Sequence, residues 1–199
     1  MTWIKTVPPN QAQGRLRALY EQTKGPNGEL DNILQAHSLR PHTLSGHLGL
    51  YKQVLHHTGN QVDKWFLEAL GVLVSALNGC TYCVEHHAEG MARLIGNTSE
   101  SERIKTDLLN RDFNRWDPKQ RTALAYAIEL TLHPSDISET LVIGMREQGW
   151  DDGEILEINQ VVSYFAYANR TVLGLGCQLE GEVLGLSPGS SDEDDWSHQ

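Results

Sequence analysis

Two cysteines and a histidine fall close together in the stretch "NGCTYCVEHHAEGMARLIG", residues 78–96. On a helix that turns about 100° per residue, Cys80, Cys83 and His87 lie within an arc of roughly 60°. Cys83 and His87 are one helical turn apart and are therefore neighbours on the helix surface. Two thiols that can form a disulfide across one turn, beside an imidazole that can accept a proton, are the minimum set for thiol-based redox chemistry.

The sequence leaves open which of the two cysteines is the nucleophile. Cys80 follows Gly79 at the expected start of the helix, where unpaired N–H groups and the helix dipole stabilise a thiolate. Cys83 is closer to His87, which could take its proton. The first argument favours Cys80 as the thiol of lower pKa, and the second favours Cys83.

Glu68 is the only acidic residue in the apolar run between Trp65 and Leu77. If that run is a helix packed antiparallel on the cysteine helix, Glu68 reaches the neighbourhood of His87. A buried carboxyl group there would have a raised pKa and could relay protons. The alternative is that Lys64 and Glu68, one helical turn apart, form an ordinary surface ion pair.

Other uses of the same residues have to be weighed. Cys80, Cys83, His87 and Glu68 could together ligate zinc, although structural zinc sites usually combine two separate half-sites. The cysteines could also be inert in a helical assembly protein without redox chemistry. We expect neither a metal nor a cofactor.

The remaining candidate residues are weaker. His86 projects away from the cysteine face, which favours a surface or interface position. Imidazoles near helix ends commonly contact terminal carbonyl groups, as expected for His56, His57 and His133. Cys177 is most simply a small buried residue. The "GLG" at 174–176 follows no strand, so it is not a dinucleotide-binding loop.

The chain of 199 residues is 39% hydrophobic and 21% charged, which is typical of one globular domain. Its net charge of −10, with no cluster of lysine or arginine, argues against nucleic acid and anionic membranes as partners. The longest apolar run is too short to span a bilayer, and the first residues do not resemble a signal peptide. We therefore expect a cytoplasmic protein with a domain over residues 1–186 and an acidic, mobile tail over 187–199.

Helical periodicity extends over nearly the whole chain, which predicts an all-α fold. We expect helices in the segments 11–25, 31–39, 41–57, 62–79, 80–95, 117–134, 135–150 and 151–185. An Asp31 or Asn32 cap, Pro41, and the pair Asp117–Pro118 mark three of the helix starts. Aligning "CTYCVEHH" with "VSYFAYAN" pairs Cys80 with Val162 and His87 with Asn169, which suggests two degenerate helical repeats. The same alignment makes Tyr164 and Asn169 candidates for the pocket.

The chain resembles the alkyl hydroperoxidase D-like proteins of the carboxymuconolactone decarboxylase superfamily, and within it the uncharacterised peroxidase-related enzymes. The stretches "AHSLRPHTLSGHLGLY", "LVSALNGCTYCVEHH" and "YANRTVLGLG" carry the resemblance, together with the spacing of Glu68, Cys80, Cys83 and His87. The likeness covers roughly residues 3 to 180.

The resemblance implies an all-helical domain that forms a homo-oligomer, as a dimer, trimer or hexamer. It also implies an antioxidant oxidoreductase in which Cys83 attacks a hydroperoxide, Cys80 resolves the sulfenic acid to a redox-active disulfide, and His87 and Glu68 relay protons. Tyr82 occupies the position of a second histidine in the best-known members, and a tyrosine is a poorer base at neutral pH.

We therefore expect a cofactor-free thiol peroxidase or disulfide reductase acting on small alkyl hydroperoxides. A partner dithiol protein or a small thiol would reduce the disulfide again.

Overall fold

The computed structural model describes residues 2–186, and every regular element in that part of the chain is a helix. A short 3-10 helix (Pro9–Gln11) precedes the first α-helix, and a π-helical stretch (Lys52–His56) continues the third. The α-helices are α1 (Gly14–Thr23), α2 (Asn32–Ala36), α3 (Pro41–Tyr51), α4 (Lys64–Leu77), α5 (Thr81–Ile95), α6 (Thr98–Asn110), α7 (Pro118–Leu132), α8 (Glu139–Glu147) and α9 (Asp152–Leu175). The predicted all-α class is confirmed.

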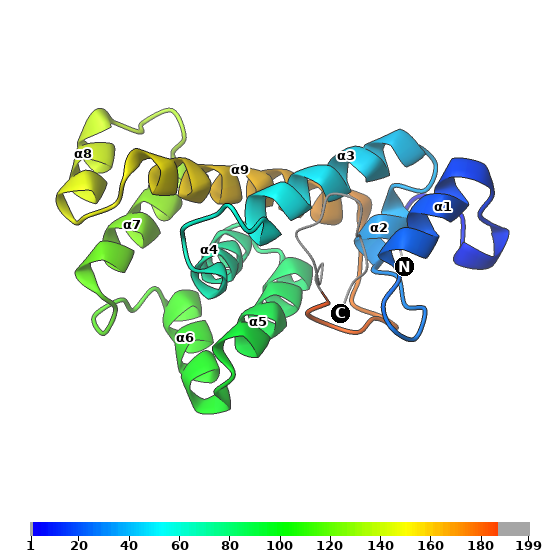
Figure 1. The fold of residues 1–199 in the computed structure, drawn as a ribbon, viewed down its shortest axis with the longest axis horizontal. Coiled ribbons are helices and arrows are strands. Elements are labelled where there is room, and N and C mark those ends of the chain that lie inside the picture. The colour runs from blue at the N-terminus through cyan, green and yellow to red at the C-terminus, as the bar shows by residue number, and fades with distance from the viewer. Residues whose placement is uncertain (1, 187–199) are drawn as a thin grey trace.

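Helix α4 forms the centre of the domain. Its residues from Phe66 to Ser75 are all buried, and it packs against α5, α6, α7 and α9. A helix that is apolar on all sides must be surrounded by other elements. In Figure 1, α9 runs along one side of α4 while α5 lies beside it. Glu68 belongs to this buried set, so its carboxyl group needs a partner inside the protein.

The turn between α4 and α5 positions the cysteine helix. Gly79 adopts a left-handed conformation with φ of 69°, which glycine tolerates without strain. The N–H of Cys80 donates to the carbonyl oxygen of Ser75 at 2.8 Å, which closes the end of α4 directly onto the start of α5. The expected antiparallel packing of the two helices follows, and the side chains of Glu68 and His87 meet.

Helix α9 is the longest element, and it connects the far end of the domain to the cysteines. It begins with a capping box, in which Asp151 accepts from the N–H of Glu154 and Glu154 accepts from the N–H of Asp151. It ends at Gly176, whose φ is 65°. In Figure 1, α7 and α8 lie at its beginning and α2 and α3 near its end.

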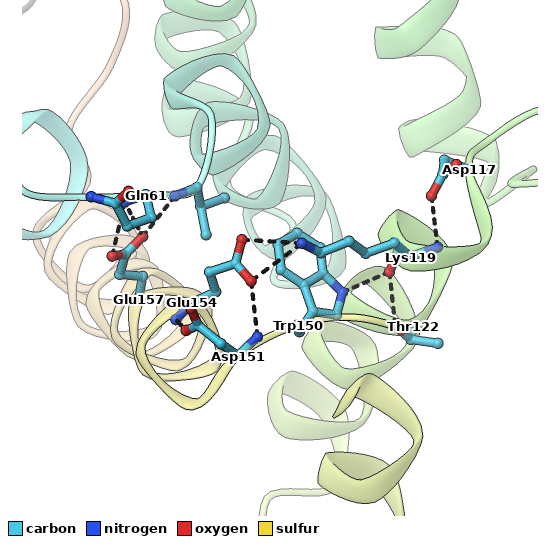
Figure 2. Close-up of polar contacts among 9 residues, drawn as sticks. Gln61, Asp117, Lys119, Thr122, Trp150, Asp151, Glu154 and Glu157 are labelled. Carbon is cyan, nitrogen blue, oxygen red and sulfur yellow. Dashed lines mark hydrogen bonds and ion pairs between the residues drawn. The ribbon is translucent and has the colours of Figure 1, made fainter. Parts of the chain in front are cut away.

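A polar network at the beginning of α9 fixes the helices around it (Figure 2). The Trp150 indole N–H donates to the carbonyl oxygen of Lys119 at 2.7 Å, and the Lys119 ammonium lies 4.1 Å from the centre of the Trp150 ring. The Glu157 carboxylate accepts from the backbone N–H groups of Gln61 at 3.0 Å and Val62 at 2.9 Å. These contacts join α7, α9 and the segment before α4.

The predicted helix starts are correct at Pro41 and at Asp117, whose carboxylate accepts from the N–H of Lys119 at 2.8 Å. Asp31 occupies the N-cap position of α2, but its side chain makes no capping hydrogen bond. Helix α6 was not predicted, although Asn97 caps it by accepting from the N–H of Glu100.

The internal alignment pairs unlike elements. Cys80 is the N-cap residue of α5, whereas Val162 lies in the interior of α9. The predicted acidic tail, 187–199, lies outside the described residues. Within the described part of the chain, no helix is both long and apolar enough to cross a membrane.

Candidate active site

The two cysteines of the C-x-x-C stretch are adjacent free thiols. Their Sγ atoms lie 3.1 Å apart, well beyond the roughly 2.05 Å of a disulfide bond. Cys80 is completely buried and Cys83 is 3% exposed. Because α5 starts between them, one turn of helix holds the pair at a distance from which a disulfide needs only a small movement.

The two thiols differ in pKa. The pKa of Cys80 is lowered, chiefly by its hydrogen bond with the Cys83 thiol and further by the Cys83 backbone N–H and the Asn169 side chain. The hydrogen bond with Cys80 raises the pKa of Cys83 well above the ordinary value, and burial adds to this. The first thiolate therefore forms on Cys80, in agreement with the helix-start argument.

Glu68 and His87 form a buried acid–imidazole pair. The Nδ1 atom of His87 lies 2.6 Å from Oε2 of Glu68, and Nε2 of His56 lies 3.7 Å from the other carboxylate oxygen. Glu68 is 2% exposed, and Lys64 is exposed at the surface. Glu68 therefore does not form the alternative surface ion pair with Lys64.

The expected raised pKa of Glu68 is wrong in its direction. Burial alone would raise it, but the charge of His87, its hydrogen bond and the charge of His56 together lower it. Glu68 is therefore ionised, and it accepts the Nδ1–H of His87. This leaves Nε2 of His87 as the nitrogen that can accept and release a proton.

Packing holds the His87 ring in one orientation. The Phe165 ring meets it edge-on, with ring centroids 4.5 Å apart. Phe165 in turn lies directly against Gly71, where an added Cβ would come within 2.2 Å of the ring. A glycine in the middle of α4 is thus required for this arrangement, because any larger residue would push Phe165 toward His87.

A pocket opens beside this pair. Cys83, His87 and Glu68 all line it, whereas Cys80 does not. Tyr164 and Tyr51 line it as well, and burial raises the pKa of both phenols well above the ordinary value. Both tyrosines therefore stay protonated and can donate hydrogen bonds inside the pocket.

A second polar cluster, which the sequence did not reveal, lies beside the same pocket. Glu182, from the segment after α9, accepts from the Tyr82 hydroxyl and lies 2.7 Å from Nε2 of His86. His86 is 7% exposed, so the expectation of a surface or interface position is wrong. The segment after α9 folds back over that face of α5 and covers it.

Asp31 completes this cluster from the start of α2. Ligand-type atoms of Asp31, His86 and Glu182 all lie within 4.8 Å of one another. Burial raises the pKa of Asp31 to about 6, while the charge of His86 opposes the shift. Burial would lower the pKa of His86, but the hydrogen bond to Glu182 and the charges of Asp31 and Glu182 raise it.

His47 lines the pocket with an unsatisfied polar atom. It is 4% exposed, and its Nδ1 has no hydrogen-bond partner among the described residues. Burial lowers its pKa to about 3, helped by the charges of His37 and His87. His47 is thus a neutral imidazole that faces the pocket.

Asn169 and Tyr164 were candidates from the internal alignment only, and both lie at the site. Tyr164 lines the pocket. Asn169 is completely buried behind the cysteines, where it accepts from the Asn78 side chain at 2.9 Å and donates to the Ser75 hydroxyl at 3.0 Å. It contributes to the lowered pKa of Cys80.

The four predicted residues are not arranged as zinc ligands. In residues 2–186, the cluster of Asp31, His86 and Glu182 is the one group in which three ligand-type atoms approach within 4.8 Å. Glu68, Cys80, Cys83 and His87 make no such group, because Glu68 binds His87 while the cysteines contact each other.

Of the weaker candidates, His57 and His133 lie apart from this chemistry, whereas His56 and Cys177 lie close to it. His133 is exposed at the end of α7, and His57 accepts from the N–H of Gly59. His56 is buried beside Glu68. Cys177 is buried as expected, and burial raises its pKa to about 11.

Comparison with solved structures shows what kind of fold holds this site. An uncharacterised peroxidase-related protein from Silicibacter sp. TM1040 is 23% identical with a TM-score of 0.76, and covers 89% of this chain and 91% of its own. A peroxidase-related protein with an alkylhydroperoxidase AhpD core, from Ralstonia eutropha JMP134, is 19% identical with a TM-score of 0.77 and the same coverage, 89% and 91%.

The debrominase Bmp8 is also similar, at 17% identity and a TM-score of 0.71, over 88% of this chain and 91% of its own. No protein-family model matches the sequence, and no curated protein matches it significantly. The chain thus has the alkyl hydroperoxidase D-like fold, as the resemblance implied, and this fold carries more than one chemistry.

Proposed function

We propose that the protein is a thiol-dependent peroxidase or disulfide reductase that reduces small alkyl hydroperoxides through Cys80 and Cys83. One observation carries the proposal: two free thiols 3.1 Å apart lie beside a pocket that Cys83 shares with the Glu68–His87 pair. The two-electron reduction of an organic peroxide requires a dithiol, a base and a pocket that admits the organic group.

Access and acidity point to different cysteines as the nucleophile. Cys80 has the lowered pKa, but its side chain is completely buried and does not line the pocket. Cys83 lines the pocket next to His87. We assign the attack to Cys83 because a nucleophile has to touch the substrate. Its proton passes to Nε2 of His87 before the attack, and this is the proton that the leaving alkoxide takes back.

The reaction then proceeds in three steps. The Cys83 thiolate attacks the terminal peroxide oxygen, the O–O bond breaks, and the alkoxide takes a proton from His87 to leave as the alcohol. The Cys80 thiolate attacks the Cys83 sulfenic acid, and hydroxide leaves as water after protonation. A dithiol protein or small thiol then reduces the disulfide and is itself oxidised.

The experiment follows one tryptic peptide, residues 65–93, which contains Glu68, both cysteines and His87. After a substoichiometric alkyl hydroperoxide, we expect this peptide to lose two hydrogens and to regain them with dithiothreitol. Cys83→Ser should abolish peroxide consumption, whereas Cys80→Ser should stop at a trapped sulfenic acid on Cys83. Full activity in both variants would refute the proposal.

The cellular setting belongs to the same proposal. We place the enzyme in the cytoplasm as an antioxidant homo-oligomer, because the compartment is reducing enough to regenerate a buried dithiol. Size-exclusion chromatography with light scattering of the reduced protein measures the oligomer directly. A monomer would refute that part without touching the redox chemistry.

A further inference from the structure

In the cluster of Asp31, His86 and Glu182 beside the pocket, two carboxylates face one imidazole, and this imbalance bears on the substrate. Three carboxylates line the pocket or belong to this cluster: Glu68, Asp31 and Glu182. Glu68 is matched by His87, with His56 nearby. Among the described residues, none that lines the pocket is a lysine or an arginine.

Among the described residues, Asp31 is the carboxylate of this cluster that has no side-chain hydrogen-bond partner of its own. His86 lies 2.7 Å from Glu182, which also accepts from the Tyr82 hydroxyl and from the backbone N–H of Asn32. One imidazole therefore faces two carboxylates. The charged groups that act on Asp31 are His86, His87, Glu182 and Glu29, and of these His87 is already paired with Glu68.

The pocket also has apolar lining. Ile33, Leu34, Ala168 and Leu186 line it together with Asp31. An organic group that enters to bring its peroxide to Cys83 would rest on these side chains. A charge on that group would be partly desolvated, which strengthens any interaction with Asp31.

We infer that the pocket selects uncharged hydroperoxides with an apolar group, and that Asp31 excludes substrates carrying a carboxylate. Like charges brought together in a partly buried site disfavour the wrong ligand, which is a common source of specificity. The inference rests on the proposed function and names its substrate class.

The test uses one pair of substrates that differ in charge and otherwise by a single methyl group. The acid is tert-butyl hydroperoxide in which one methyl hydrogen is replaced by a carboxylate, and the neutral partner is the methyl ester of that acid. In the wild-type protein, we expect kcat/KM for the ester to exceed that for the acid by about tenfold or more. Asp31→Asn should bring the ratio close to one by speeding the acid.

A matched control is Asp136→Asn, which removes an exposed carboxylate in the loop between α7 and α8. It should leave the ratio as in the wild type. An equal rate for acid and ester in the wild type, or the same ratio in Asp31→Asn as in the wild type, would overturn the inference.

The alcohols that correspond to the two peroxides separate this inference from the proposed function. If neither peroxide oxidises the cysteines, the peroxidase proposal fails, but binding of the alcohols, followed by NMR titration, still compares the charges. Preferred binding of the ester alcohol, lost in Asp31→Asn, supports the exclusion of anions. Equal binding of both alcohols to the wild type refutes it.

Discussion

Nδ1 of His87 lies 2.6 Å from Oε2 of Glu68, although α4 and α5 contribute these residues from opposite sides of a tight turn. The carboxylate fixes which ring nitrogen carries the proton, so Nε2 is the nitrogen available for exchange. Burial would by itself neutralise Glu68, and the two imidazoles overcome it. The pair therefore holds an ionised acid and a pre-oriented base in the apolar core.

Glu68→Gln keeps the shape of this side chain but removes its charge. We expect kcat/KM for peroxide to fall by about a hundredfold, because the amide no longer stabilises protonated His87. The folded-state pKa of Glu68 is lowered, so its ionisation stabilises the fold above its unfolded pKa and this contribution is lost as the pH falls through the folded pKa. Urea unfolding at neutral and acid pH should show a lower free energy of unfolding for the variant than for the wild type at neutral pH only.

The thiol hydrogen bond can be tested through the pKa of Cys80. Cys83→Ala removes the donor and should raise that pKa, whereas Cys83→Ser keeps a hydroxyl donor and should raise it less. Ultraviolet absorbance of the thiolate during a pH titration measures both. Cys177 interferes little, because its pKa of about 11 keeps it protonated through most of the range. An identical Cys80 pKa in all three proteins would contradict the assignment.

Asp31 should destabilise the protein as it ionises. Its folded-state pKa of about 6 lies above the ordinary 3.8. The contribution of this group to the free energy of unfolding is therefore fully present below pH 3.8 and is lost as the pH rises through 6. Asp31→Asn should raise the free energy of unfolding by up to about 3 kcal/mol at pH 8 and change it little near pH 4. A variant less stable than the wild type at pH 8 would show that the carboxylate is instead stabilised by its neighbours.

His47 combines a structural cost with a position in the pocket. His47→Phe removes a buried nitrogen that has no partner among the described residues, so we expect stability to rise by about 1 kcal/mol. The same change should lower peroxide turnover, because it removes a neutral hydrogen-bonding group from the wall. Thermal unfolding and peroxide consumption measured on one sample distinguish this from a purely structural role, in which turnover would not change.

Gly71 and Gly46 form a matched pair of helix glycines. A Cβ at position 71 would lie 2.2 Å from the Phe165 ring, while one at position 46 meets nothing within 4 Å. Gly71→Ala should destabilise the fold by about 1–3 kcal/mol and lower activity by shifting Phe165 against His87. Gly46→Ala should be neutral or stabilising by up to about 1 kcal/mol. If both substitutions behave alike, Phe165 moves freely and does not orient His87.

Short-range patterns predicted the elements and the centre of the site. Helical periodicity and prolines gave α3, α7 and the all-α class, and a helix turn is enough to bring Cys80, Cys83 and His87 together. The contact between Glu68 and His87 was one of two arrangements that the sequence left open, and the burial of Glu68 decides it against a surface ion pair with Lys64. The charge of Glu68 was not predictable, since it depends on how two imidazoles approach the carboxylate.

The cluster of Asp31, His86 and Glu182 had no signal in the sequence. Asp31, His86 and Glu182 come from three distant segments, and none has a spacing that marks it. The sequence suggested a helix cap for Asp31 and a surface position for His86. In the structure, the segment after α9 covers His86. Helix α6 could have been found from the Asn97 cap and the Glu100 that follows it three residues later.

The hydrogen bond between Tyr82 and Glu182 joins residues 100 positions apart. A ribosome that adds about 5–20 residues per second needs roughly 5–20 s to travel that distance. Throughout this interval the cysteine pair has been synthesised, while the segment that closes one side of its pocket has not. A nascent chain therefore contains both thiols before the segment that covers their pocket exists, so the pocket cannot yet exclude oxidants by size or charge.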